Sequence, residues 1–414
     1  MRYINTTFAH GNGPYARDID WAIEVNNVRE GRGLNRLPIV VPLVYGERQQ
    51  RIMKEEIESN APNSFLEKHP DEIWLDQKQG EVLNKLMFKG KDYSKNLMLL
   101  AETYQKIEDE TQRHLDGKRK LENFVNSEIA EFDLRDAELQ LGLNNRMQTG
   151  ISNQFYTAGG AGPFDEILER AISNPQINLD EESMKKALPI AKRIIENQKI
   201  IFSNDPGVFS YDSSRQKRDN EIFTPGFIHP PKPDYTELPG KGIYLLMTGI
   251  DGIRESGMYD AVLDFGMKLF APKFSINNLS ESIRNKVIPL NPSQINNPNV
   301  VAQYARSGWS TVWLSQMAEK GFISPPYQQG DDPEMLFNEK GIVKLGLGTI
   351  LRDEPQKVLE KAIGFSKNVG KYNKKIISTY GTLDGIRYAA EIVVDFMEGR
   401  NVSKYKKVEP VSNC

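Results

Sequence analysis

The sequence predicts an α/β protein of two domains in which strands and helices alternate. The chain has 414 residues, more than one hydrophobic core usually serves, so two domains of roughly 200 residues each are expected. Apolar strand-like runs alternate with segments of helical periodicity, a pattern typical of parallel sheets covered by helices. A proline-dense stretch over residues 225–233 separates two series of this alternation and is typical of an interdomain linker.

The first predicted domain begins with a strand over residues 3–9, a glycine-containing loop over 10–14 and then a helix. A second strand, over 37–45, is a nearly continuous apolar run of the kind found in parallel sheets that are covered on both faces. Residues 71–146 combine long charged stretches with apolar residues at helical spacing. They predict two or three amphipathic helices that form a helical insertion in this domain.

The alternation continues to the end of the chain. A glycine-rich loop over 159–162 precedes a helix, and a further helix over 184–197 leads to a strand over 199–203. After the linker the sequence predicts strands over 242–247, 268–274, 286–290, 320–325 and 343–347, and a long amphipathic helix over 383–398. These elements divide the chain into an N-terminal domain (1–235), a C-terminal domain (236–382) and a terminal helix with its tail (383–414).

Composition excludes several classes of protein. The net charge of −3 gives no electrostatic reason to expect a nucleic-acid partner. The one cysteine, Cys414, allows no intrachain disulfide and no cysteine-based metal cluster. The N-terminus turns polar too early for a secretory signal, and no apolar run approaches the ~20 residues that span a bilayer. We therefore expect a cytoplasmic protein with at most peripheral membrane contact.

A turn of small residues, Ser307-Gly308-Trp309-Ser310-Thr311, opens a predicted helix in the second domain. The first amides of a helix have no intrahelical acceptor, and the helix dipole favours an anion at that end. The hydroxyls of Ser310 and Thr311 could donate to phosphate oxygens or cap the helix. The turn therefore indicates a diphosphate site, although a plain N-cap without ligand would use the same residue types.

About fifteen residues later, the strand over 320–325 ends in a cluster of amides and carboxylates: Gln329, Asp332, Glu334 and Asn338. Carboxylates form charge-assisted hydrogen bonds with hydroxyl groups, which are stronger than neutral ones. We therefore interpret the cluster as a sugar site, with Glu334 as the first candidate ligand. Acidic residues are also favoured at helix N-termini without any ligand.

The turn and the cluster together resemble the donor-binding region of inverting, metal-independent glycosyltransferases of the GT-B type. The similarity is to the peptidoglycan N-acetylglucosaminyltransferase and its relatives among the UDP-glycosyltransferases. It implies two Rossmann-like domains facing each other across a cleft, with the acceptor in the first domain and the nucleotide in the second. The last helix would pack back across the cleft. Pro333 and Glu334 stand where the peptidoglycan enzyme has paired glutamines, so the resemblance does not identify the sugar.

A second glycine loop follows the first predicted strand of the C-terminal domain. Thr248, Gly249 and Gly252 match the loop that such enzymes carry there, and glycines permit close approach of the backbone to a diphosphate. The helix dipoles and Arg306 or Arg254 would neutralise the departing diphosphate without a metal ion. The resemblance thus implies a hexosyltransferase whose donor is a UDP-sugar and which needs no cofactor.

On the acceptor side, His10 ends the first strand, where open α/β sheets place their chemistry. Inverting transfer needs a base for the acceptor hydroxyl, and histidine titrates in the useful range. Asp20 is the second catalytic candidate, with Asp18 beside it, and Gly11, Asn12 and Gly13 form the predicted acceptor loop. Asp18 and Asp20 also match an Asp-x-Asp metal motif, but their position on the first helix argues against a metal role.

Other functions stay open at this point. A UDP-N-acetylglucosamine epimerase would keep the nucleotide site without an acceptor groove. A non-catalytic binding protein would use the charged helices of residues 71–146 to engage a partner. A dinucleotide dehydrogenase is disfavoured because the first glycine loop lacks a third glycine. The acceptor, which could be a saccharide, a lipid or a small natural product, is not identified by the sequence.

Overall fold

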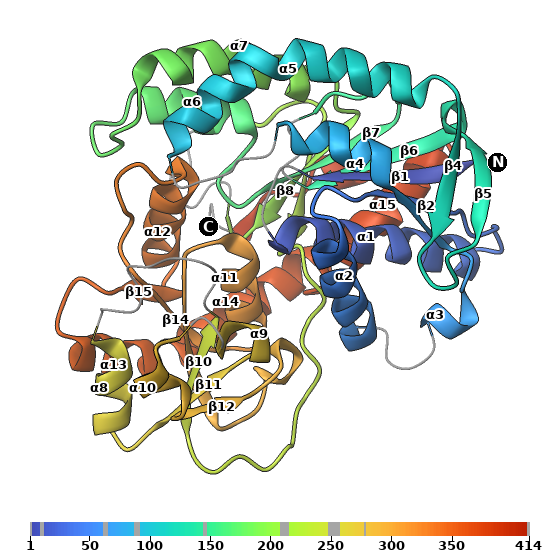
Figure 1. Ribbon diagram of the computed structural model, residues 1–414. Helices are drawn as coiled ribbons and strands as arrows, with labels where there is room; N and C mark the ends of the chain where they lie inside the picture. The colour runs from blue at the N-terminus through green and yellow to red at the C-terminus, as the bar shows by residue number, and fades with distance from the viewer. Residues whose placement is uncertain are drawn as a thin grey trace.

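The computed structural model describes residues 2–8, 12–60, 65–86, 92–143, 147–207, 215–246, 257–276 and 279–411. Two β-sheets organise these residues, one in each half of the chain, and helices cover both (Figure 1). The fold class predicted from the sequence, two α/β units with mainly parallel sheets, is confirmed.

The first sheet has the strand order β5-β4-β3-β2-β1-β6-β7-β8-β9 within the described residues. Its pairs are parallel except for the β4–β5 hairpin, which joins the sheet antiparallel to β3 at one edge. The strands are β1 (Tyr3–Phe8), β2 (Ile39–Pro42), β3 (Ile73–Asp76), β4 (Lys118–Asn123), β5 (Ile129–Asp133), β6 (Ala137–Leu143), β7 (Gln154–Gly159), β8 (Ile200–Asp205) and β9 (Glu221–Pro225).

The second sheet has the order β12-β11-β10-β13-β14-β15, and all its described pairs are parallel. Counted from its own first strand this is the order 3-2-1-4-5-6 of a doubly wound dinucleotide-binding sheet. The strands are β10 (Gly242–Leu246), β11 (Lys268–Ala271), β12 (Val287–Pro289), β13 (Val300–Ala305), β14 (Gly321–Ser324) and β15 (Gly348–Ile350).

Helices connect the strands and bury apolar faces against them. Those that accompany the first sheet are α1 (Asn12–Gly31), α2 (Glu47–Asn60), α3 (Phe65–Lys68), α4 (Gln77–Asn84), α5 (Tyr93–Leu115), α6 (Phe164–Ile172) and α7 (Glu181–Glu196). Those that follow in the second half are α8 (Met258–Asp264), α9 (Lys273–Ile276), α10 (Glu281–Arg284), α11 (Trp309–Met317), α12 (Pro333–Lys344), α13 (Pro355–Gly364), α14 (Ser366–Tyr380), α15 (Gly385–Met397) and α16 (Ser403–Lys406).

The C-terminal helix α15 returns to the first half of the chain and lies beside α1 (Figure 1). Arg32 of α1 donates to Asp395 at 2.8 Å and to Glu398 at 2.7 Å, and Arg387 donates to Glu24 at 2.6 Å. The last part of the chain therefore ties the second half to the first.

The two halves also meet through aromatic side chains that donate hydrogen bonds to a backbone carbonyl and to a buried carboxylate of the first half. The indole N–H of Trp313 on α11 donates to the carbonyl of Pro206 at 2.9 Å, next to the end of β8. Asp205 accepts hydrogen bonds from the hydroxyls of Tyr372 at 2.6 Å and Tyr380 at 3.1 Å, both on α14. These buried contacts fix the positions of α11 and α14 relative to the first sheet.

Residues 71–146 differ from the helical insertion that the sequence predicts. They contain the strands β3, β4, β5 and β6 of the first sheet as well as the helices α4 and α5. Strand β3 is only four residues long, and the β4–β5 hairpin is half exposed with charged residues on its open face, so neither produces a long apolar run. Tertiary pairing rather than local pattern sets these strands.

The second half also differs in two places. The predicted strand over 343–347 is the end of α12 and a turn, and the strand itself, β15, begins at Gly348. Strand β13, which the sequence did not reveal, lies next to β10 in the middle of the sheet. Since β13 leads into α11, it is the strand that positions the predicted diphosphate turn.

Candidate functional site

The predicted donor residues that the structure describes lie near the place where the strand order of the second sheet reverses. Strands β10 and β13 are neighbours, and the chain continues from them to opposite sides of the sheet. In doubly wound sheets, ligands bind beyond the carboxyl ends of the strands at this switch point. Residues 247–256, which follow β10 and include the predicted Thr248, Gly249 and Gly252, lie outside the described residues.

The turn after β13 leaves backbone amides open at the start of α11. Gly308 is the N-cap, and no side chain caps the helix. The amides of Gly308 and Thr311 bond to the carbonyls of Arg306 at 2.8 Å and Gly308 at 3.1 Å. The amides of Trp309 and Ser310 make no hydrogen bond to the described backbone. This helix start can therefore offer two N–H donors to an anion.

The hydroxyl groups of the turn are engaged in holding its shape. Thr311 Oγ1 lies 2.9 Å from the carbonyl oxygen of Arg306 and 2.6 Å from that of Gly308, so its one O–H donates within the turn. Ser307 Oγ donates to the carbonyl of Met335 on α12 at 3.2 Å. The Thr311 hydroxyl is thus engaged within the turn, while Ser310 is partly exposed, and donation from either hydroxyl to a phosphate stays a prediction. The backbone amides of Trp309 and Ser310 are therefore the donors of this turn that its internal hydrogen bonds do not use.

The second predicted cluster starts α12, directly beside this turn. Asp332 is the N-cap and accepts from the Glu334 amide at 3.0 Å, with Pro333 at the first helical position. Asn338 is fully buried, and its Nδ2 donates to the Ser307 carbonyl at 2.7 Å and to Glu334 Oε1 at 3.3 Å. Asn338 therefore joins the two turns, and it holds the half-buried Glu334 next to the start of α11.

Arg306 and Asp331 form an ion pair between the two turns. The sequence had indicated Arg306 as a counter-charge for a diphosphate and Asp332 as a donor-sugar ligand, but it had not singled out Asp331 or predicted this pair. Asp332 serves as the helix cap, whereas the carboxylate of Asp331 reaches the guanidinium group. Gln329, predicted as a sugar ligand, is exposed in the same loop.

The start of α11 faces the first half of the chain. Trp309 is 3% exposed and packs on Gly160 in the loop between β7 and α6. A Cβ atom at Gly160 would lie 1.7 Å from Trp309 Cδ1, so only glycine allows this approach. The amide of Tyr93, the first residue of α5, donates to the carbonyl of Gly330 at 3.2 Å. Both turns of the candidate site therefore touch the opposite half.

The predicted acceptor residues are only partly described. His10 and Gly11 lie outside the described residues, and Asn12 and Gly13 begin α1. Asp20 is buried and pairs with Arg17 at 3.0 Å, an arrangement common for structural carboxylates. The catalytic roles assigned to His10 and Asp20 stay predictions.

Asp18 lies two residues before Asp20 on α1, and its surroundings differ from those of Asp20. Its side chain is 1% exposed. Burial raises the pKa of Asp18 well above its ordinary value, and an interaction with the backbone of Leu143 at the end of β6 only partly opposes this. Perturbed carboxyl groups near strand ends are typical of functional sites, although structural groups are also perturbed.

Glu339 follows Asn338 on α12 and is a titratable group that the sequence did not single out. It is 2% exposed and accepts from Arg352 at 2.9 Å. Burial raises the pKa of Glu339 to about 7, and the positive charge of Arg352 opposes this rise. The carboxyl group therefore titrates near neutral pH, one residue away from the amide that joins the two turns.

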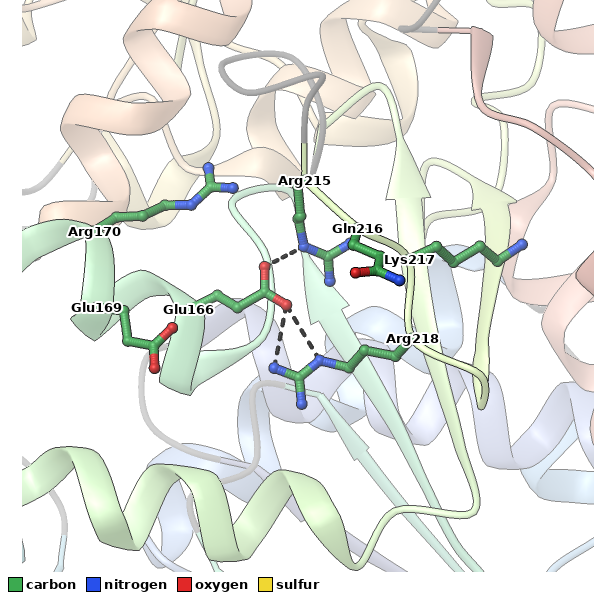
Figure 2. A pocket seen from close by; sticks show the side chains of 7 residues that line it. All are labelled: Glu166, Glu169, Arg170, Arg215, Gln216, Lys217 and Arg218. Atoms are coloured by element: carbon green, nitrogen blue, oxygen red, sulfur yellow. Dashed lines mark hydrogen bonds and ion pairs between the residues drawn. The ribbon is translucent and has the colours of Figure 1, made fainter.

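A surface cavity of about 410 Å³ lies away from these turns, between α6 and the segment before β9 (Figure 2). Glu166 points between the guanidinium groups of Arg215 and Arg218 and pairs with both. Arg215 also pairs with Glu221 at 3.0 Å, and Arg218 with Asp165 at 2.7 Å. Because three carboxylates face these two guanidinium groups, we assign the cluster a structural role in fastening the segment to α6.

Neither a metal cluster nor a membrane-spanning helix is found among the residues that the structure describes. No three His, Cys, Asp or Glu side chains of these residues are grouped as metal ligands would be. None of their helices is both long enough and apolar enough to cross a bilayer.

Comparisons with known proteins give a fold but no sequence relative. No protein-family model matches the chain, and no curated protein matches it. Among solved structures it is similar to CalG4, the calicheamicin glycosyltransferase, with 13% identity and a TM-score of 0.54 over 97% of this chain and 99% of that one. UGT71G1 of Medicago truncatula, complexed with UDP-glucose, has 11% identity and a TM-score of 0.54 over 96% and 98%.

A third solved structure, LpCGTa in complex with UDP, has 9% identity and a TM-score of 0.52 over 96% of this chain and 98% of that one. Each of these likenesses extends over almost the whole of both chains. The chain therefore has the GT-B fold, as the motifs of the second half had indicated. At these identities the likeness extends to the arrangement of the chain and not to the chemistry of the site.

Proposed function

We propose that this protein is a glycosyltransferase that transfers a hexose from a UDP-sugar to an acceptor hydroxyl by a single, inverting displacement. The observation that carries the proposal is the open start of α11 at the switch point of the second sheet, with Glu334 held beside it through Asn338. The GT-B fold adds support, as do the complexes of LpCGTa with UDP and of UGT71G1 with UDP-glucose, two structures with that fold.

In the proposed reaction the acceptor oxygen attacks the anomeric carbon as the bond from that carbon to the diphosphate oxygen breaks. The bonding electron pair stays on the departing UDP. The amides of Trp309 and Ser310 stabilise its developing charge, because a helix N-terminus is a preorganised anion site. Arg306 contributes a positive charge from the same turn. No metal ion is needed in this scheme.

Glu334 orients the sugar by accepting hydrogen bonds from its hydroxyl groups. A half-buried carboxylate forms stronger bonds with hydroxyls than a neutral group does. His10 takes the proton of the acceptor hydroxyl, a role assigned from its place at the end of the first strand. The acceptor binds on the side of the first half, which Gly160 and Tyr93 bring to the two turns.

The test combines UDP calorimetry with a screen of UDP-sugars for hydrolysis and transfer. We expect the wild-type chain to bind UDP and to consume at least one UDP-sugar. Glu334→Gln should lower turnover by about 10- to 100-fold, the value of a charge-assisted hydrogen bond, while UDP affinity changes little. Glu182→Gln is the matched control, because Glu182 occupies the same position after an aspartate N-cap in α7, with its side chain exposed.

Each alternative gives a different result. Unchanged turnover in Glu334→Gln would remove this residue from the site. Isomerised UDP-sugar without any acceptor would identify an epimerase. The absence of stabilisation by UDP would overturn the proposed UDP site, as the non-catalytic alternative predicts, since a ligand at a hundred times its dissociation constant adds ~2.7 kcal/mol to the free energy of unfolding.

A further inference from the structure

The ion pair between Arg306 and Asp331, here called the Arg306–Asp331 latch, joins the two turns of the proposed diphosphate site. Arg306 directly precedes the Ser307-Gly308 turn at the start of α11, and Asp331 belongs to the loop that begins α12. Their side chains are 31% and 29% exposed, so solvent and ligands reach both. A diphosphate bound at α11 would have to share Arg306 with this carboxylate.

Asp331 is held in place by bonds that involve its own backbone and its side chain. Its amide donates to the Gln328 carbonyl at 3.2 Å, and its carbonyl accepts from the Tyr327 hydroxyl at 3.1 Å. Its Oδ1 accepts from the Asp332 amide at 2.8 Å. The neighbouring Gly330 is in turn fixed by the bond from Tyr93. The carboxylate is therefore presented to Arg306 by a fixed frame, unlike the side chains of a mobile surface pair.

Arg306 keeps donor capacity that the latch does not use. The guanidinium group has five N–H donors, and Asp331 engages it through Nη2. Its Nε is buried and has no hydrogen-bond partner in the described part of the chain. A phosphate group, with several acceptor oxygens and more than one negative charge, suits a guanidinium better than a single carboxylate does.

We propose that Asp331 is a positioning residue that holds Arg306 at the empty site and yields it to the nucleotide diphosphate. This rests on the proposed function. When UDP leaves after transfer, Asp331 recaptures Arg306, and so the latch competes with the product. Asp331 thereby weakens nucleotide binding and speeds product release, a step that limits turnover in many enzymes.

The experiment is calorimetric titration of the full chain with UDP in four forms: wild type, Asp331→Asn, Arg306→Met and the double variant. Asparagine keeps an oxygen for the Asp332 amide, so the loop should retain its shape. A partly exposed ion pair is worth up to about 1 kcal/mol, so Asp331→Asn should bind UDP about fivefold more tightly. Arg306→Met should bind UDP less tightly than wild type.

The double variant distinguishes an effect of Asp331 that acts through Arg306 from direct electrostatic repulsion between Asp331 and UDP. If Asp331 acts through Arg306, removing its charge in the Arg306→Met background should leave UDP affinity unchanged. Persistent tightening in that background would mean that Asp331 merely repels the anion, and unchanged or weaker binding in Asp331→Asn alone would also overturn the latch. In both cases the proposed function would stand, whereas a wild-type chain that does not bind UDP would overturn both.

Discussion

Replacing Gly160 with alanine should disturb the start of α11 from the opposite half of the chain. A Cβ atom at this position would lie 1.7 Å from Cδ1, 1.8 Å from Nε1 and 2.0 Å from Cγ of Trp309. Ordinary contacts of a Cβ atom begin near 3.4 Å, so the indole ring must retreat by more than 1 Å. It has little room to do so, because it stacks on Trp313 at a centroid distance of 6.2 Å.

The cost of this overpacking is about 1–3 kcal/mol. For a chain of this length, about 2 kcal/mol corresponds to a decrease of the melting temperature by roughly 2 °C. A larger effect is expected on the site, because Trp309 carries one of the two open amides. A displacement of about 1 Å should lower UDP affinity by roughly tenfold, since well-placed donors are sensitive to such errors.

The assay is UDP calorimetry together with thermal unfolding. Gly364→Ala is the control, because Gly364 lies in α13 and a Cβ atom there meets nothing within 4 Å. It should leave UDP affinity unchanged and stabilise the protein slightly. A second change, Trp309→Leu, should abolish most of the penalty of Gly160→Ala, as expected for residues in direct contact. Wild-type UDP affinity in Gly160→Ala would refute the coupling between this loop and α11.

Two further predictions concern α12. Because burial raises the pKa of Glu339 from 4.5 to about 7, the folded protein keeps a proton that the unfolded chain releases, and stability should fall by up to about 3 kcal/mol as the pH rises through this range. Glu339→Gln should remove this part of the pH dependence of the unfolding free energy, measured by denaturant unfolding at pH 5 and pH 8. An equal change in unfolding free energy between these two pH values for wild type and variant would contradict the assignment. Asn338→Ala should cost about 1–3 kcal/mol of unfolding free energy, because the buried Ser307 carbonyl loses its donor, and should lower UDP-sugar turnover. Normal turnover and stability would show that the two turns do not depend on this amide.

The turn at Ser307 and the helix start at Asp332 could be predicted from the sequence because both are local signals. A glycine before an apolar helix and an aspartate followed by proline mark helix starts by their own backbone chemistry. Their meeting could not be predicted with the same ease. It depends on Asn338, whose buried amide reaches the Ser307 carbonyl 31 positions earlier in the chain.

Strand β13 was not predicted because the residues before it and one residue within it are polar. Residues 291–299 are rich in asparagine and proline and read as a loop, and Gln303 interrupts the apolar pattern of the strand. The strand is nevertheless buried, since it pairs on both sides in the middle of the sheet. The β4–β5 hairpin escaped for the opposite reason, because an exposed edge needs few apolar residues.

No local pattern in the sequence predicts the aromatic contacts between the two halves. Trp309 reads as a buried helix residue and Gly160 as a loop residue, and only the fold places one on the other. The same holds for the choice between Asp331 and Asp332. The sequence shows two adjacent acids, and the backbone decides that one caps α12 while the other faces Arg306.

A crystal structure of the complex with UDP would locate the diphosphate relative to α11. We expect a phosphate oxygen within about 3 Å of the amide nitrogen of Trp309 or Ser310, the usual length of an N–H···O hydrogen bond. UDP bound elsewhere, with the start of α11 still free of phosphate, would contradict the proposed site.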